Sequence, residues 1–559
     1  MADHATLTTP GIPRIVMGRI SLIAADAAPG TAAKAWRRPA NPVIAGFAGV
    51  VLMMVVGWLS GQDYNWDLLN YHFASPALLL SGRYDVNVAP SGLQSWFNPI
   101  GYVPAFLAIT SLPPWLASAA LAAASGLNAP LIYLIADAVA GDLPREARVR
   151  SSCACVAIGM SGAIMFGEAG TTFLDSTLSI AALGAIYAVI VAMRSPDLAK
   201  AQHSVAVAGI LMGAACGLKL TNVPLAIGLA GAVTACVLVR RLSPAAVVAL
   251  TIGGAAGFAL TGGWWAWRMW TMFGNPVFPI FNQLFRSPFA PASPVIDTTF
   301  LPRDWSGIVT YPWHWLIGDR TPGTEVPLVD RRYPIGLSAA LLVAIGCIVR
   351  RDDRDGRSSA ALLVATFALA TYLMWLFAFA ILRYLVTIEL LSGVLVLAAL
   401  RILPPVRDRW TPRVMIVAAV LLSMTTHHAG WGRAPFTADW FGARGMTAVH
   451  RAGTVYVLPG DTPLGFLIHA LPDDARFVRV GGTFPLTRGD LLGARALSMI
   501  RAAPFVRSLA EAPTDAAGIA TLSRFGLAIR PGTCRPIQTK TGRVESCELA
   551  LSGPAGRLN

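Results

Sequence analysis

Long apolar runs separated by short polar stretches occupy most of the chain. The run at residues 41–60 has no charged side chain, and the run at 245–267 is equally free of charge. About 20 apolar residues are enough for a helix to cross the hydrocarbon core of a bilayer. This pattern predicts a polytopic α-helical membrane protein with about eleven spans. We place them near residues 43–60, 115–139, 151–167, 172–193, 203–218, 220–239, 245–263, 335–349, 358–379, 384–402 and 413–430.

The polar segments around these spans complete the predicted organisation. Residues 1–42 are polar and rich in alanine, and we expect a cytoplasmic tail rather than a signal peptide. The transmembrane domain at 43–430 contains two long segments on one side, at 61–114 and 264–334. At 431–559 strand-like runs alternate with helix-like runs, which predicts a soluble α/β domain.

Composition and charge are those of a membrane protein. Of the 559 residues, 55% are hydrophobic and 13% are charged, whereas soluble domains carry about a quarter charged residues. The net charge of +14 comes from short basic clusters between spans, and no basic stripe with interleaved aromatic residues indicates nucleic-acid binding. These clusters lie near residues 145–150, 194–200, 240–241, 350–357 and 401–413. By the positive-inside rule they are cytoplasmic, so both long segments and the C-terminal domain face the periplasm of a bacterial inner membrane.

Cysteine and tryptophan usage fit this topology. Five of the seven cysteines fall in or beside spans, where a thiol behaves as a small apolar group. Cys534 and Cys547 of the C-terminal domain could form a disulfide in an oxidising compartment, or remain free thiols. Six of the tryptophans in the second long segment suit an interfacial belt or could stack on a sugar ring: Trp264, Trp265, Trp267, Trp270, Trp313 and Trp315. We interpret His314, Asp319 and Glu325 of this segment as ordinary loop residues.

The first long segment opens with acid, amide, phenol and imidazole side chains. Asp63, Asp67 and Tyr71 are four residues apart, so a helix would align them along one face. Asn70 lies beside them and His72 follows, and we expect Asn70, Tyr71 and His72 to contact the substrate. Such a group could perform acid/base chemistry, for example by taking the proton of an acceptor hydroxyl. The alternative is a helix N-terminus stabilised by acids near its dipole, which explains Asp63 better than the other residues.

The stretch from Asp67 to His72 has the form D-x-x-N-Y-H, and an L-x-x-G-R element ending at Arg83 follows it. After a first span, this arrangement resembles the GT-C superfamily of membrane glycosyltransferases, which use polyprenyl-phosphate-linked sugars. It is most similar to their family 39 and family 87 types. The resemblance implies a GT-C-like fold with Asp67 as the catalytic base and Asp63 in reserve. Leu68 stands where many family 39 members have a second acid.

Two later elements carry the same resemblance. The stretch at 217–222 is similar to the G-x-x-K-[YF]-T turn of the superfamily, with a shortened spacing and a leucine in place of the aromatic residue. The stretch at 382–385 resembles its R-Y-L element. By this resemblance Lys219, Arg383 and Tyr384 bind the donor phosphate, Arg383 through bidentate hydrogen bonds and Lys219 as a point charge. The alternative for either cation alone is snorkelling to lipid headgroups.

Glu168 and Asp175 flank the short outer turn between the third and fourth predicted spans. The superfamily often has an acid there that contacts the acceptor or a metal, so the resemblance makes both candidate substrate contacts. Asp175 is preferred, because an acid inside a span is costly to retain. No cluster has the ligand spacing of zinc or calcium, and no cofactor is expected, although a divalent metal is compatible with the family.

These features predict an inverting membrane glycosyltransferase, either a hexosyl- or a pentosyltransferase. It would pass a sugar from a polyprenyl-phosphate carrier to a glycan, lipid or protein acceptor at the periplasmic face, with membrane lipids and no nucleic acid as further partners. This activity requires Asp63, Asp67, Lys219 and Arg383 to converge on one outward cavity. Two other classes remain: a transporter or flippase of lipid-linked sugars, with charges along a central path, and a non-catalytic scaffold for envelope assembly.

Overall fold

The computed structural model describes residues 42–295, 297–318, 323–349, 356–402 and 408–551. The predicted tail at 1–42 lies outside these ranges except for its last residue. Asp319 and most of the basic cluster at 350–357 also lie outside them, so what was predicted for these residues stays a prediction.

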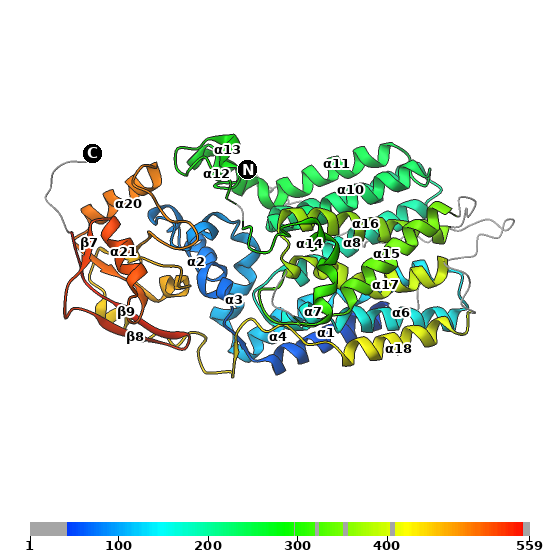
Figure 1. The fold of residues 1–559 in the computed structure, drawn as a ribbon, viewed down its shortest axis with the longest axis horizontal. Coiled ribbons are helices and arrows are strands. Elements are labelled where there is room, and N and C mark those ends of the chain that lie inside the picture. The colour runs from blue at the N-terminus through cyan, green and yellow to red at the C-terminus, as the bar shows by residue number, and fades with distance from the viewer. Residues whose placement is uncertain (1–41, 296, 319–322, 350–355, 403–407, 552–559) are drawn as a thin grey trace, which may run out of the picture. The chain divides into compact units, whose positions relative to one another are not determined.

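Nine helical segments in the described ranges are long and apolar enough to cross a membrane. They are α1 (Pro42–Ser60), α4 with α5 (Pro114–Gly126, Asn128–Val139), α8 (Asp175–Arg194), α9 (Leu198–Leu218), α10 (Val223–Leu238), α11 with α12 (Ala245–Phe258, Trp264–Phe273), α15 (Arg332–Val349), α16 (Gly356–Ala378) and α17 (Val386–Ile402). Two shorter helices, α6 (Arg145–Met160) and α18 (Thr411–Met424), pack against each other. The protein is therefore a multi-pass membrane protein, as predicted, and most of these helices run side by side in one bundle (Figure 1).

The third predicted span, 151–167, was wrong at its C-terminal end. Helix α6 stops at Met160, and a short helix α7 (Ala163–Gly167) begins after a break. The first three N–H groups of α7 donate to the buried carboxylates of Asp330 and Glu389, at 2.8 to 3.0 Å. Acids from distant parts of the chain thus cap the new helix, and this contact has no local sequence signal.

The seventh predicted span, 245–263, ends too early. The helix continues through a π-helical turn, η6 (Ala259–Gly263), into α12, because no residue stops it before Gly274, which has a φ of +66°. Four of the tryptophans therefore lie on a helix. Trp267 is 68% exposed, as an interfacial belt requires, whereas Trp265 is buried and donates its indole N–H to the carbonyl of Trp96 at 2.8 Å.

Glycines bring α9 and α11 into backbone contact. A Cβ at Gly213 would lie 2.0 Å from the carbonyl oxygen of Gly254, and one at Gly209 would lie 2.3 Å from that of Leu250. Close approach of this kind supplies van der Waals contact in lipid, where helix association has no hydrophobic driving force. It holds the end of α9, next to Lys219, firmly against the bundle.

Both long segments are folded. The first contains β1 (Gln62–Asp63), the π-helix η1 (Leu68–His72), α2 (Ala74–Leu80), three short 3-10 helices and α3 (Val103–Ser111); the 3-10 helices are η2 (Tyr84–Val86), η3 (Gly92–Trp96) and η4 (Ile100–Tyr102). The second contains α13 (Asn282–Phe285), α14 (Trp305–Thr310) and the 3-10 helix η7 (Tyr311–Leu316). Further 3-10 turns lie at η5 (Leu220–Asn222) and η8 (Leu382–Leu385).

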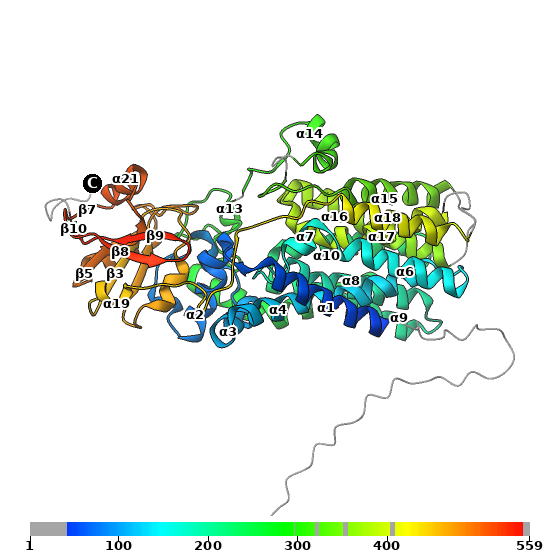
Figure 2. The same ribbon diagram turned by 90° about the horizontal axis from the view of Figure 1, so that it is seen from below.

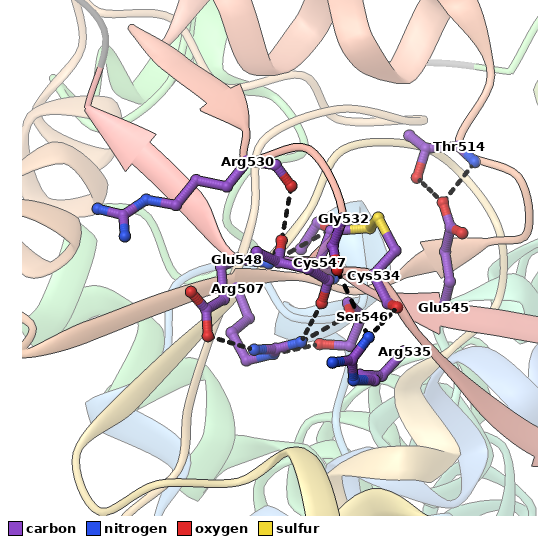
Figure 3. Close-up of a disulfide and its surroundings, with 12 residues drawn as sticks. Arg507, Thr514, Arg530, Gly532, Cys534, Arg535, Glu545, Ser546, Cys547 and Glu548 are labelled. Carbon is purple, nitrogen blue, oxygen red and sulfur yellow. Dashed lines mark hydrogen bonds and ion pairs between the residues drawn. A yellow bond between two sulfur atoms is a disulfide. The ribbon is translucent and has the colours of Figure 1, made fainter.

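The C-terminal region has the predicted α/β character. A parallel sheet has the order β4-β3-β5 and consists of β3 (Thr454–Leu458), β4 (Arg476–Arg479) and β5 (Phe505–Ser508). An antiparallel sheet of β6 (Ala510–Glu511), β9 (Gly542–Ser546) and β8 (Arg535–Thr539) follows, and β7 (Leu527–Ile529) pairs with β10 (Leu549–Leu551). The helices of this region are α19 (Met446–Val449), η9 (Gly465–Ala470), α20 (Leu491–Ala502) and α21 (Ala516–Arg524). A disulfide joins Cys534 to Cys547 at the open end of the β8–β9 hairpin (Figure 3).

The C-terminal region is packed against the first long segment. The N–H of Val88 donates to the carbonyl of Phe477 at 2.9 Å, and the N–H of Arg479 donates to that of Val88 at 3.1 Å, so Val88 lies beside the edge strand β4. Strand β1 pairs antiparallel with β2 (Arg433–Ala434). Buried apolar side chains from both regions form common clusters. The segment that carries Asp67 is thus fixed by residues from the other end of the chain, and Figure 2 shows α2 beside the C-terminal strands.

Candidate active site

Asp67 lies at the start of η1, after the chain leaves strand β1. The predicted alignment of Asp63, Asp67 and Tyr71 on one helical face was wrong, because Asp63 belongs to the strand that pairs with Arg433–Ala434. The helix begins only after Asn65, whose side-chain oxygen accepts the N–H of Leu68 at 2.8 Å. The strand and the helix therefore point the two acids into different surroundings.

Asp63 is fully buried and supports the fold locally. Its carboxylate accepts the N–H of Asn65 at 3.0 Å, the side-chain amide of Asn65 at 2.6 Å and the N–H of Thr172 at 3.2 Å. Burial raises the pKa of the Asp63 carboxyl, and the nearby charge of Arg433 opposes this effect. These contacts tie the first long segment to the turn before α8.

Arg383, in η8, is the centre of an ionic cluster. Its guanidinium donates to Asp175 at 3.0 Å and to both oxygens of Glu325 at 3.1 Å, and it lies 3.4 Å from Asp67. The Arg383 side chain is only 4% exposed. An arginine in this position is always charged and presents several N–H groups in one plane, which suits it to carboxylates and phosphates. We call Asp67, Asp175, Lys219, Glu325 and Arg383 the Arg383 cluster.

Lys219 completes the cluster from the end of α9. Its ammonium donates to the two oxygens of Asp175 at 2.7 and 2.8 Å, and the Lys219 and Asp175 side chains are 8% and 5% exposed. Of the four residues predicted to converge, Lys219, Arg383 and Asp67 do so, and Asp63 does not. The three meet in a largely buried ionic cluster, so the convergence that the transferase prediction required is met only in part.

Glu325 is a member of the cluster that sequence reasoning missed. Besides binding Arg383, its carboxylate accepts the indole N–H of Trp431 at 3.0 Å. The interpretation of Glu325 as an ordinary loop residue was therefore wrong. A lone glutamate between threonine and valine in an irregular segment has no periodicity that could have identified it.

Aromatic rings surround the two cations. The Arg383 guanidinium lies 3.8 Å from the ring centre of Phe173 and 5.2 Å from that of Tyr384. The Lys219 ammonium also lies 5.2 Å from the Tyr384 ring. Tyr384, predicted to be a donor contact, thus lies beside both cations, and its ring face stabilises their charge.

The acids of the site ionise at different pH values. Burial, together with the charges of Glu325 and Asp175, raises the pKa of Asp67 to about 6, although Arg383 and Lys219 oppose the shift. Burial and the charge of Asp175 raise the pKa of Glu168 to about 8. The pKa of Glu168 is thus raised further than that of Asp67, and shifts of this kind are typical of acid/base sites.

Glu168 lies at the end of α7, close to the Arg383 cluster. One of its oxygens accepts the N–H of Ser176 at 2.8 Å, and the other is buried with no hydrogen-bond partner among the described residues. Asp175 is the first residue of α8. The structure therefore brings both predicted acids near the cations, with Asp175 bound to them directly.

The other predicted contacts of the first segment separate into two groups. Tyr71 and His72 are buried with Tyr102, on whose ring His72 stacks at 4.0 Å. His72 Nδ1 lies 2.8 Å from the hydroxyl of Thr172, and burial together with the charges of Lys219 and Arg383 lowers the pKa of His72. His72 is therefore neutral, and both side chains lie on the side of η1 near the cluster.

Asn70 faces away from the cluster, contrary to the prediction. Its amide donates to the carbonyl of Ser91 at 3.1 Å, and its side-chain oxygen accepts a hydrogen bond from Arg479 at 3.2 Å. Arg479 comes from strand β4 and is almost fully buried. Asn70 thus connects η1 to the C-terminal sheet.

One group of described His, Cys, Asp and Glu side chains has the proximity needed to hold a metal ion. It consists of Cys534, Glu545 and Cys547. Its two sulfurs are joined as a disulfide (Figure 3), which leaves no thiolate ligand. A metal at the Arg383 cluster was not indicated by the sequence.

No protein-family model and no curated relative match the sequence. Solved structures do resemble this one. ArnT from Cupriavidus metallidurans, crystallised with undecaprenyl phosphate, is 13% identical with a TM-score of 0.51, covering 92% of this chain and 99% of that one. Its apo state is 13% identical with a TM-score of 0.52, covering 91% and 98%. The likeness extends over nearly both chains and shows the fold: this protein has the fold of the GT-C membrane glycosyltransferases.

Proposed function

We propose, for a chain with the GT-C fold, that it is a glycosyltransferase that moves a sugar from a polyprenyl-phosphate carrier to an acceptor at the periplasmic face. The observation that carries the proposal is the convergence of Asp67 with Lys219 and Arg383, which come from three distant parts of the sequence. A carboxylate beside two buried cations combines a base with an anion site.

Asp67 suits the role of general base. A base must be ionised at the working pH and yet retain affinity for a proton, so a pKa close to the working pH is best. Asp67 meets both needs, because its pKa is raised to about 6. Its side chain is also 17% exposed, so an acceptor hydroxyl can reach it.

Lys219 and Arg383 suit the leaving phosphate. In a single displacement, the acceptor oxygen bonds to the anomeric carbon of the sugar while the bond from that carbon to the phosphate oxygen breaks. The electron pair of the broken bond stays on the phosphate, and the acceptor proton passes to Asp67. The phosphate gains negative charge during this step, so two cations held in place stabilise the transition state more than the ground state.

Two further observations support the carrier and the face. ArnT, whose fold this chain shares, binds undecaprenyl phosphate in its crystal structure. The Cys534–Cys547 disulfide is typical of an oxidising compartment such as the periplasm, and its domain packs on the segment that carries Asp67. Hexosyl or pentosyl transfer, and a glycan, lipid or protein acceptor, are equally compatible with this site.

The experiment is a transfer assay in proteoliposomes with a panel of polyprenyl-phosphate sugars and membrane-fraction acceptors. We expect Asp67→Asn to lower kcat/KM by about 10²- to 10⁴-fold, the usual contribution of a general base. The matched control is Asp297→Asn, which removes an exposed acid of the second long segment that caps the N–H of Thr299. Full activity in Asp67→Asn would overturn the proposal.

A further inference from the structure

Glu325 holds Arg383 with the same geometry that a phosphate would use. Its two oxygens accept hydrogen bonds from Nε and Nη2 of the guanidinium, each at 3.1 Å. Two parallel N–H···O bonds of this kind are the usual form of both arginine–carboxylate and arginine–phosphate pairs. Glu325 therefore occupies the bidentate edge of the arginine that is assigned above to the donor.

The charges of the cluster are already net negative, so the binding of another anion is unfavourable. Three carboxylates, those of Asp67, Asp175 and Glu325, contact Arg383, and Asp175 also binds Lys219. When all are ionised, three negative charges face two positive ones. A donor phosphate would add a further negative charge in a largely buried site, where uncompensated charge is strongly unfavourable. One carboxylate must give way for the donor to bind.

Glu325 is the carboxylate that is free to leave. Asp175 begins α8 and receives two hydrogen bonds from Lys219 as well as one from Arg383. Asp67 is held at the start of η1. Glu325 lies in an irregular stretch between η7 and α15, and its side chain is the most exposed of the three, at 27% against 17% for Asp67 and 5% for Asp175.

We propose that Glu325 competes with the donor phosphate for Arg383. The phosphate displaces Glu325 when it binds, and the Glu325–Arg383 pair thereby sets the apparent affinity for the donor. This inference rests on the proposed function. In the free protein Glu325 neutralises an arginine that would otherwise be buried without a partner on that edge. The apparent affinity for the donor therefore equals the intrinsic affinity multiplied by the fraction of molecules in which Glu325 does not occupy Arg383.

The test measures binding of undecaprenyl phosphate to the full chain in detergent, for the unmodified protein and Glu325→Gln. Glutamine keeps an acceptor for Trp431 and removes the competing charge. We expect binding to tighten about two- to fivefold, which corresponds to the usual strength of a partly exposed ion pair. Asp297→Asn, which removes a charge from the same long segment away from Arg383, should leave the affinity unchanged.

The outcomes separate this inference from the proposed function. If the unmodified protein binds the lipid phosphate and Glu325→Gln binds it equally or more weakly, the competitor role is refuted while the proposed function stands. If neither the unmodified protein nor Glu325→Gln binds the lipid phosphate, both the proposed function and this inference are refuted.

A second readout comes from the pH profile. The charge of Glu325 contributes to the raised pKa of Asp67. In Glu325→Gln the acid limb of kcat/KM should therefore move to lower pH, which a residue that merely supports the loop would not cause. An unmoved limb would contradict the assigned contact.

Discussion

The pH dependence of transfer tests the assignment of Asp67 most directly. A free aspartate has a pKa near 3.8, whereas burial and the neighbouring acids Glu325 and Asp175 raise that of Asp67 to about 6. The profile of kcat/KM reports the ionisation of the free enzyme, and a general base is active only when it is deprotonated. Activity should therefore rise with pH through a midpoint near 6.

The magnitude follows from the two pKa values. With a pKa of about 6, Asp67 is ionised in about nine-tenths of the molecules at pH 7 and in about one-tenth at pH 5, so kcat/KM should fall about tenfold between them. With a pKa of 3.8, the loss over the same range would be only about 6%. A phosphodiester donor keeps one negative charge over this interval, so it adds no titration of its own.

The assay is the initial rate at low donor concentration, measured in proteoliposomes from pH 5 to pH 8 at constant ionic strength. Preincubation at each pH followed by assay at pH 7 separates ionisation from unfolding. A flat profile down to pH 5, or the same acid limb in the residual activity of Asp67→Asn, would refute the reasoning.

Two further predictions concern the parts that hold the site together. Asp175→Asn leaves the buried Lys219 and Arg383 short of a counter-charge, which should lower the unfolding free energy by about 3 kcal/mol or more. In a double-mutant cycle of thermal unfolding in detergent, Asp175→Asn combined with Lys219→Met should recover much of this loss. Additive losses would contradict the pairing. Gly213→Ala should destabilise by about 1–3 kcal/mol, because its Cβ would lie 2.0 Å from the Gly254 carbonyl, whereas Gly254→Ala, with its nearest neighbour at 3.9 Å, is the matched control and should be close to neutral.

The membrane helices could be predicted from the sequence because each is a local pattern. An uncharged run such as 41–60 has few options other than a span, and α1 begins and ends within a residue or so of the predicted limits. Lys219 and Arg383 were singled out by the resemblance of their surroundings to the G-x-x-K-[YF]-T and R-Y-L elements, and a charge at the membrane boundary is costly unless it has a partner. Their contact with Asp175 depended on packing, which the sequence could only suggest through resemblance.

The errors arose where a contact joins distant residues. Asp63 was assigned to a helix because its spacing to Asp67 fits one, whereas a two-residue strand formed with Arg433–Ala434 decides its conformation. Glu325 had no pattern at all. Glu389 did offer a signal, an acid within the apolar run of α17, and its buried carboxylate caps α7 at Ile164 and Met165. An isolated acid inside a predicted span can therefore indicate that a helix N-terminus lies nearby.

The pairing of β1 with β2 also has a consequence for biosynthesis. Gln62 and Asp63 directly follow the first membrane helix in the sequence, but their partners Arg433 and Ala434 follow the last one. Strand β4, which supplies Arg479 to Asn70, is made later still. Domains form as the chain is synthesised, and such distant pairings form slowly. The first helices are therefore inserted before the segment that carries Asp63 and Asp67 has its pairing partners. The surroundings of Asp67 are therefore completed only at the end of translation, and an interrupted chain carries the membrane helices without these contacts.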